Sequence, residues 1–104
     1  MYVATDATGR VSLRDQANFS EFYVHADGRG PDPVDADLRR TGAGYIRDGY
    51  AWIHTAFLET ELAASPGGWE SSLAGMIAYA RSKGWISVEG RESVRAHLQG
   101  VSPN

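Results

Sequence analysis

The sequence contains no cysteine. Disulfide bonds, thiolate metal sites and a cysteine nucleophile are therefore excluded. It also has no apolar run close to the ~20 residues that a membrane-spanning helix needs. The first residues, MYVATDATGR, lack the basic start and the apolar centre of a secretory signal. We therefore expect a cytoplasmic protein with no membrane partner.

An excess of positive charge is absent too. The chain has 13 acidic and 10 basic residues, for a net charge of −3 with histidine neutral. Proteins that bind nucleic acid usually carry basic residues that neutralise phosphates. Nucleic-acid binding is therefore not expected.

Motifs for cofactors and metals are missing as well. The sequence has no complete glycine-rich phosphate loop and no zinc-protease or serine-hydrolase motif. The acidic cluster of Asp27, Asp32, Asp35 and Asp37 lacks the spacing of a calcium loop and suits helix capping better. We expect no cofactor and no metal site.

What is present indicates one globular domain over residues 1–104. Of these residues, 42% are hydrophobic and 22% are charged, enough to bury one core. Twelve glycines and four prolines predict many chain reversals and several short elements. Residues 101–104 are expected to fray.

Alternating apolar and polar residues predict strands with one buried face. Residues 3–5 and 11–13 alternate on either side of a turn at 6–9, and residues 22–25 continue the pattern. The stretch YIRDGYAWIH, residues 45–54, holds the strongest hairpin signal, because Asp48-Gly49 suits the positive φ angles of a type I′ turn.

Two later segments are ambiguous between strand and helix. Residues 50–58 are rich in aromatic and β-branched side chains, and a helix there would place Trp52 opposite the other apolar residues, so we expect a strand. Residues 91–99 fit both periods. Gly90 argues against a helix that begins as early as Ser87, because glycine weakens the interior of a helix, and we expect a strand.

Two helices are expected, near 33–41 and over about 68–83. The shorter has Pro33 at its first position, with acidic residues at its start and basic residues at its end, as the helix dipole favours. The longer has apolar residues at helical spacing and ends at Gly84. Trp85 is expected to fold back onto its last turn.

Together these elements predict an α+β fold. We expect a mostly antiparallel sheet of five to six short strands, with the long helix packed on one face. Both alternating faces of residues 50–58 are largely apolar, so the uncovered face is expected to pair with a second subunit in a homodimer. An 11.3 kDa species in sedimentation at micromolar concentration would contradict this expectation.

Aromatic residues provide the best candidate for a binding site. Tyr45, Tyr50 and Trp52 surround one hairpin turn, and Trp85 follows the long helix. If helix and sheet meet, these rings would line a pocket for a small apolar or aromatic molecule. The same rings would also suit a core or a subunit interface.

His54 is the candidate for acid–base chemistry. On a strand it shares a face with two of these rings, and Glu59 follows soon after in the sequence. Burial and a neighbouring carboxylate can tune an imidazole to act as a general base near neutral pH. His25 and His97 lie on other predicted strands, and nothing in the sequence brings the three histidines together.

Three functions follow from these observations. The first is a homo-oligomeric domain that binds a small apolar or aromatic molecule, or serves as an accessory protein. The second is a cofactor-independent isomerase, cyclase or lyase with His54 as the general base and Tyr50 or Glu59 as its partner. The third is binding of a protein partner through a sheet edge.

Overall fold

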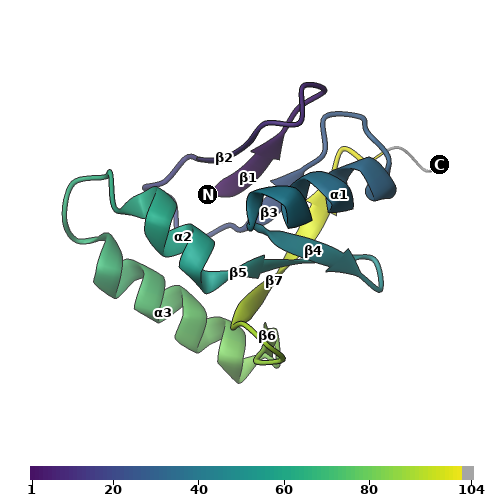
Figure 1. Ribbon diagram of the computed structural model, residues 1–104. Helices are drawn as coiled ribbons and strands as arrows, with labels where there is room; N and C mark the ends of the chain where they lie inside the picture. Colours follow the sequence, from purple (N-terminus) through teal and green to yellow (C-terminus); the bar gives the residue numbers. More distant parts are fainter. Residues whose placement is uncertain (102–104) are drawn as a thin grey trace.

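The computed structural model describes residues 1–101 as seven strands and three helices (Figure 1). Val101 packs against the core, whereas residues 102–104, where fraying is predicted, lie outside the described residues. The elements, in chain order, are β1 (Tyr2–Thr5), β2 (Val11–Arg14), β3 (Tyr23–His25), α1 (Pro31–Thr41), β4 (Gly44–Arg47), β5 (Tyr50–His54), α2 (Thr55–Leu62), α3 (Trp69–Ser82), β6 (Ile86–Ser87) and β7 (Ser93–Gln99).

The strands form one curled sheet in the order β2-β1-β3-β7-β5-β4, with β6 paired to β7. β1 pairs with β3 and β3 with β7 in parallel, and the other pairs are antiparallel. The α+β class is confirmed, but the prediction of a mostly antiparallel sheet is wrong, because the sheet is mixed. Alternation indicates which residues are buried but not which strands pair, and the chain between β2 and β3 returns so that β3 runs in the same direction as β1.

The C-terminal strand β7 organises the sheet. One side of β7 pairs with β5 through residues 93–96. The other side pairs with β6 through Ser93 and Val94, and with β3 only from His97 onward. On this second side no strand pairs with Arg95 and Ala96, which lie between the segments paired to β6 and to β3. The prediction of a strand within residues 91–99 is confirmed.

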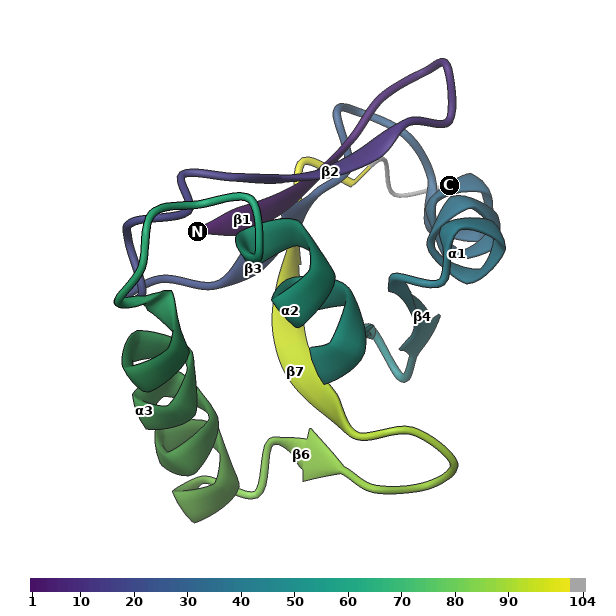
Figure 2. The ribbon, with the colours of Figure 1, turned by 60° about the vertical axis from the view of Figure 1, so that its left-hand side comes forward.

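The two expected helices are present. α1 begins at Pro31, two residues before the predicted start, and ends at Gly42, which has a φ of 74°. α3 covers nearly all of the predicted range and runs alongside β7 (Figure 2). After it, the Trp85 backbone N–H donates to the Ala80 carbonyl at 2.9 Å, and the Trp85 ring lies 6.0 Å from that of Tyr79. Trp85 therefore folds back onto the last turn, as expected.

Residues 55–58 correct a prediction. They begin helix α2, so the predicted strand ends at His54 instead of continuing to residue 58. Leu58 and Leu62, four residues apart, are both fully buried, as helical spacing requires. Burial of this pair outweighs the strand propensity of the residues before it.

The hairpin at 45–54 is confirmed. Asp48 and Gly49 have φ values of 55° and 81°, as a type I′ turn requires. Tyr45 lies opposite Trp52 across the two strands, so their side chains share one face.

The core lies on one face of the sheet, beneath α1 and α2. Its largest fully buried side chains are apolar residues from strands and helices, and Met1. The opposite face, which we name the outer face, carries the alternate strand residues. These are Tyr23 and His25 of β3, Tyr45 and Arg47 of β4, Tyr50, Trp52 and His54 of β5, and Arg95, His97 and Gln99 of β7.

Two members of the acidic cluster, Asp35 and Asp37, make contacts from α1, but the N-cap is Gly30 and no side chain caps the helix, so the prediction of capping is wrong. The Asp37 carboxylate lies 2.7 Å from the Arg29 guanidinium and 3.2 Å from that of Arg40. The hydrogen bond from Arg29 lowers the pKa of Asp37, with a smaller contribution from Arg40. Asp35 accepts a hydrogen bond from the Ile46 backbone N–H at 2.6 Å, which ties α1 to β4.

In residues 1–101, no helix is long and apolar enough to cross a membrane.

Candidate functional site

A cavity of about 450 Å³ opens beside Arg95 and Ala96 of β7, between the strands β6 and β3. Its walls come from the chain leading into β3, from the start of β5, from β7, from α3 and from Trp85, which lies three residues after α3. The volume lies within the range of sites that hold small organic molecules. The lining residues are Phe19, Ser20, Glu21, Phe22, Tyr23, Tyr50, Met76, Tyr79, Trp85, Val94, Arg95, Ala96, His97 and Gln99.

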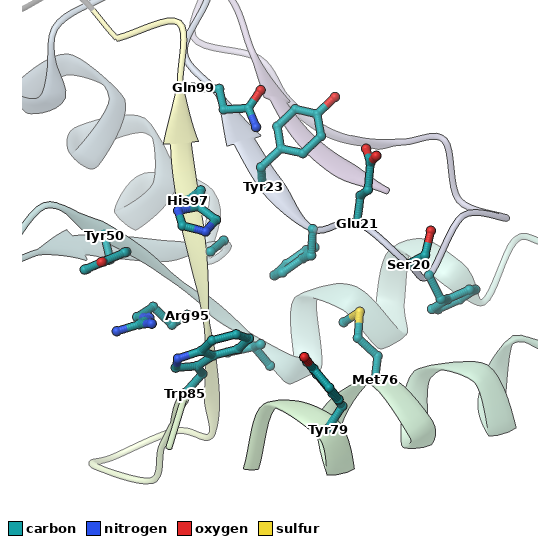
Figure 3. Close-up of a pocket in the computed structure, with 14 residues that line it drawn as sticks. Ser20, Glu21, Tyr23, Tyr50, Met76, Tyr79, Trp85, Arg95, His97 and Gln99 are labelled. Atoms are coloured by element: carbon teal, nitrogen blue, oxygen red, sulfur yellow. The ribbon is translucent and has the colours of Figure 1, made fainter. Parts of the chain in front are cut away.

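Apolar and aromatic residues make up nine of the fourteen that line the cavity (Figure 3). Val94 and Ala96 of β7 are buried and belong to the core side of the strand, and Met76 packs against the same core from α3. Tyr79 is exposed, and its ring packs against the Trp85 ring in an edge-to-face arrangement with an interplanar angle of 67°. Such a wall suits a flat apolar body, because aromatic rings bury large areas and stack in defined geometries.

Arg95 provides the positive charge in the cavity. Its guanidinium carbon lies 4.2 Å from the centroid of the Tyr50 ring and 5.1 Å from that of Trp85, so two aromatic rings hold it (Figure 3). Within residues 1–101, Arg95 makes no ion pair with a carboxylate. Its charge is stabilised by the ring faces through cation–π attraction.

Further polar groups surround the opening. The His97 ring lies 6.0 Å from the Tyr50 ring. The Tyr23 ring stacks on Tyr2 at 5.0 Å, and burial raises the pKa of its phenol. The phenol therefore stays protonated near neutral pH and can donate a hydrogen bond. Glu21 lies across the opening from Arg95 (Figure 3).

The structure separates the four predicted ligand-binding aromatics into two pairs. Tyr50 and Trp85 line the cavity. Tyr45 and Trp52 do not line it and instead pack around Arg47, whose guanidinium carbon lies 5.7 Å and 5.5 Å from their ring centroids. All three strand aromatics share the outer face. Trp52 lies opposite Arg95 in the β5–β7 register, yet of the three only Tyr50 lines the cavity.

The predicted acid–base pair is not in contact. His54 lies at the end of β5, where its Nδ1 is 2.8 Å from the Oγ of Ser93, which is 0% exposed. Glu59 is exposed on α2, and no hydrogen bond or ion pair joins it to His54 within residues 1–101. Neither residue lines the cavity. The histidines do not form a metal-binding group among the described residues.

The protonation of His54 leads to a testable prediction. Burial lowers the pKa of its imidazole, and the positive charge of Arg91 lowers it further. The folded protein therefore takes up this proton less readily than the unfolded chain, whose histidine has a pKa of about 6.5. As the pH falls from that value toward the lowered pKa, the unfolded chain binds more protons and the free energy of unfolding decreases.

An NMR titration of the His54 ring checks this prediction. We expect a pKa below the ordinary value, and a partial return toward that value in Arg91→Gln, which removes the second cause. A His54 pKa at or above about 6.5 would contradict the burial described here.

Arg95, His97 and Tyr23 were not predicted as site residues. Their alternation with apolar neighbours placed them on a polar strand face, which is what solvent-exposed residues also show. The cavity arises because β3 and β6 leave a gap beside β7, and this depends on pairing between segments some 70 residues apart in the sequence. The aromatic clustering was the one local signal, and it led to Tyr50 and Trp85.

Comparison with known proteins finds no match to a family model, to a curated protein or to a solved structure. No activity is therefore transferred to these residues from a relative. The cavity and the outer face have to be interpreted from their own chemistry.

Proposed function

We propose that the protein binds a small molecule with a flat aromatic or apolar body in the cavity beside β7. The observation that carries the proposal is the combination of size and lining: about 450 Å³, an apolar floor, and aromatic rings on several sides. Binding sites for small molecules are typically concave and mostly apolar, with a few polar groups that orient the ligand.

Two polar side chains of this cavity are held in place by aromatic rings. Arg95 is held between two rings, and Tyr23 is stacked on Tyr2. Side chains held in place in the free protein lose little conformational entropy when a ligand binds. A ligand body placed between the α3 side and the β7 side would contact Met76, Tyr79 and Trp85.

A thermal-shift screen of aromatic fragments tests the proposal with two matched variants. Tyr50→Ala removes a cavity wall, whereas Tyr45→Ala removes a tyrosine from the neighbouring strand that also lies under an arginine but does not line the cavity. We expect hits that raise the melting temperature of the wild type and of Tyr45→Ala, and that lose this effect in Tyr50→Ala. A ligand at 100 times its Kd stabilises a protein by about 2.7 kcal/mol, well above the limit of such a screen.

Two results would contradict the proposal. One is a screen without hits on the wild-type protein. The other is hits that Tyr50→Ala retains in full, because such ligands bind elsewhere.

The other functions expected from the sequence stay predictions. The acid–base enzyme depends on His54, which lies outside the cavity and away from Glu59. Part of the basis for the homodimer has changed, because residues 55–58 belong to α2 rather than to a two-sided apolar strand. The homodimer, the use of a sheet edge for a protein partner and the cytoplasmic location stay as expectations.

A further inference from the structure

We propose that the ligand of this cavity carries a carboxylate next to its aromatic body, and that Arg95 binds that carboxylate. This inference rests on the proposed function and specifies its chemistry.

Arg95 differs from the other arginines of the chain. Five arginines form ion pairs: Arg29, Arg39, Arg40, Arg47 and Arg81. Three more, at positions 10, 14 and 91, are exposed to water. Among the described residues, Arg95 is thus the one arginine that is half-buried and without a carboxylate partner.

A half-buried cation without a counter-charge is costly unless other groups compensate for its lost hydration. The two ring faces against Arg95 provide part of this compensation, but they do not use its N–H donors. A carboxylate accepts two parallel N–H bonds from a guanidinium, which is the strongest arrangement of this kind. A ligand carboxylate would therefore supply the counter-charge and the hydrogen-bond acceptors for the Arg95 guanidinium.

The rings also fix the guanidinium where an anion can reach it. Contact with Tyr50 on one strand and with Trp85 beyond α3 restricts the side chain. The Arg95 side chain lies in the cavity wall and on the outer face of the sheet (Figure 3). Little ordering entropy remains to be lost when the anion binds.

Acidic side chains are scarce around Arg95. The chain has a net charge of −3, yet none of the ten strand residues that define the outer face is acidic. Glu21 is the only carboxylate of the cavity lining, and it lies across the opening from Arg95. A single negative charge fits this arrangement better than a dianion, because Glu21 would repel a second charge. This favours a carboxylate over a phosphate monoester.

Calorimetric titration of matched pairs of compounds tests the inference. The pairs are 2-naphthoate with 2-naphthamide, and indole-3-acetate with indole-3-acetamide, so that within a pair an anionic carboxylate is replaced by a neutral amide of nearly the same size and shape. We expect the wild-type protein to bind each carboxylate about ten- to a hundredfold more tightly than its amide, the range for a hydrogen bond to a charged group. In Arg95→Gln this preference should fall to about unity, while the Kd of the amide changes less than about threefold.

Two further variants sharpen the experiment. Arg47→Gln is the matched control, because its guanidinium also lies over two rings but outside the cavity, and it should keep the full preference. Arg95→Lys keeps the charge without the planar fork and should give an intermediate preference. It also keeps the test valid if Arg95→Gln fails to fold, and retained amide binding shows that a variant is folded.

The outcomes separate this inference from the proposed function. Equal binding of carboxylate and amide by the wild type would overturn the inference and leave the cavity proposal in place. A preference that persists in Arg95→Gln would overturn the role of Arg95. Failure of all four compounds to bind would overturn the inference and, with a fragment screen that finds no hits, the proposed function too.

Discussion

Replacing Gly44 with alanine is expected to lower the free energy of unfolding by about 3 kcal/mol or more. Gly44 is buried at the start of β4, opposite Ile53 of β5. A Cβ at this position would collide with the Trp52 carbonyl oxygen and would lie 2.9 Å from its carbonyl carbon. These are backbone atoms of the paired strand, so no side-chain rotation relieves the clash. The two strands would have to separate.

Thermal or urea denaturation followed by circular dichroism measures this effect. In a domain of this size, a loss of 3 kcal/mol lowers Tm by about 12 °C or more. Gly75→Ala is the matched control: Gly75 is inside α3, with nothing within 4 Å of the added carbon. That variant should be more stable than the wild type by about 0.5–1 kcal/mol, because alanine favours a helix. A Gly44→Ala protein as stable as the wild type would contradict the β4–β5 pairing.

Replacing Leu58 with alanine is expected to lower the free energy of unfolding by about 2–5 kcal/mol. Leu58 is fully buried in α2, so truncation leaves a cavity in the core. Ala56, two residues earlier, is exposed in the first turn of the same helix. Ala56→Glu should therefore change stability by less than about 0.5 kcal/mol, since an acidic residue at the start of a helix is favourable.

This pair of variants distinguishes a helix from a strand at residues 55–58. In a strand, positions 56 and 58 would share a face, and both substitutions would be harmful or both tolerated. Equilibrium denaturation of the two proteins decides between these cases. Severe destabilisation by Ala56→Glu would mean that the helix does not begin at Thr55.

Elements with local determinants could be predicted from the sequence. The Asp48-Gly49 turn requires only its own two residues, and its φ angles follow the expectation. α1 and α3 are marked by apolar spacing and by the left-handed glycines after their last residues, Gly42 and Gly84. For α2 the local signals were divided, and burial of Leu58 and Leu62 against the rest of the core decided the outcome. The parallel pairing of β1, β3 and β7 depends on contacts far apart in the sequence, which a pattern of alternation does not record.

In the candidate site too, residues with a local signal could be predicted and residues placed by strand register could not. Tyr50 and Trp85 attracted attention as aromatic residues, and both line the cavity. Arg95 did not, because its importance comes from its register: it lies opposite Trp52 on β5 and reaches the rings of Tyr50 and Trp85. The net charge of the whole chain is negative and does not indicate how charge is distributed over its surface. The strand positions named for the outer face hold no carboxylate.

Chemical-shift mapping shows directly whether a small aromatic molecule binds beside β7, as we propose. The experiment is a titration of ¹⁵N-labelled protein with 2-naphthoate, followed in two-dimensional ¹H–¹⁵N spectra that include the Arg95 side-chain Nε–H. We predict saturable shifts concentrated at residues 19–23, 76–85 and 94–99, together with the Arg95 Nε–H. Shifts confined to the turn and outer residues of the β4–β5 hairpin, or no saturable shift at all, would contradict the account.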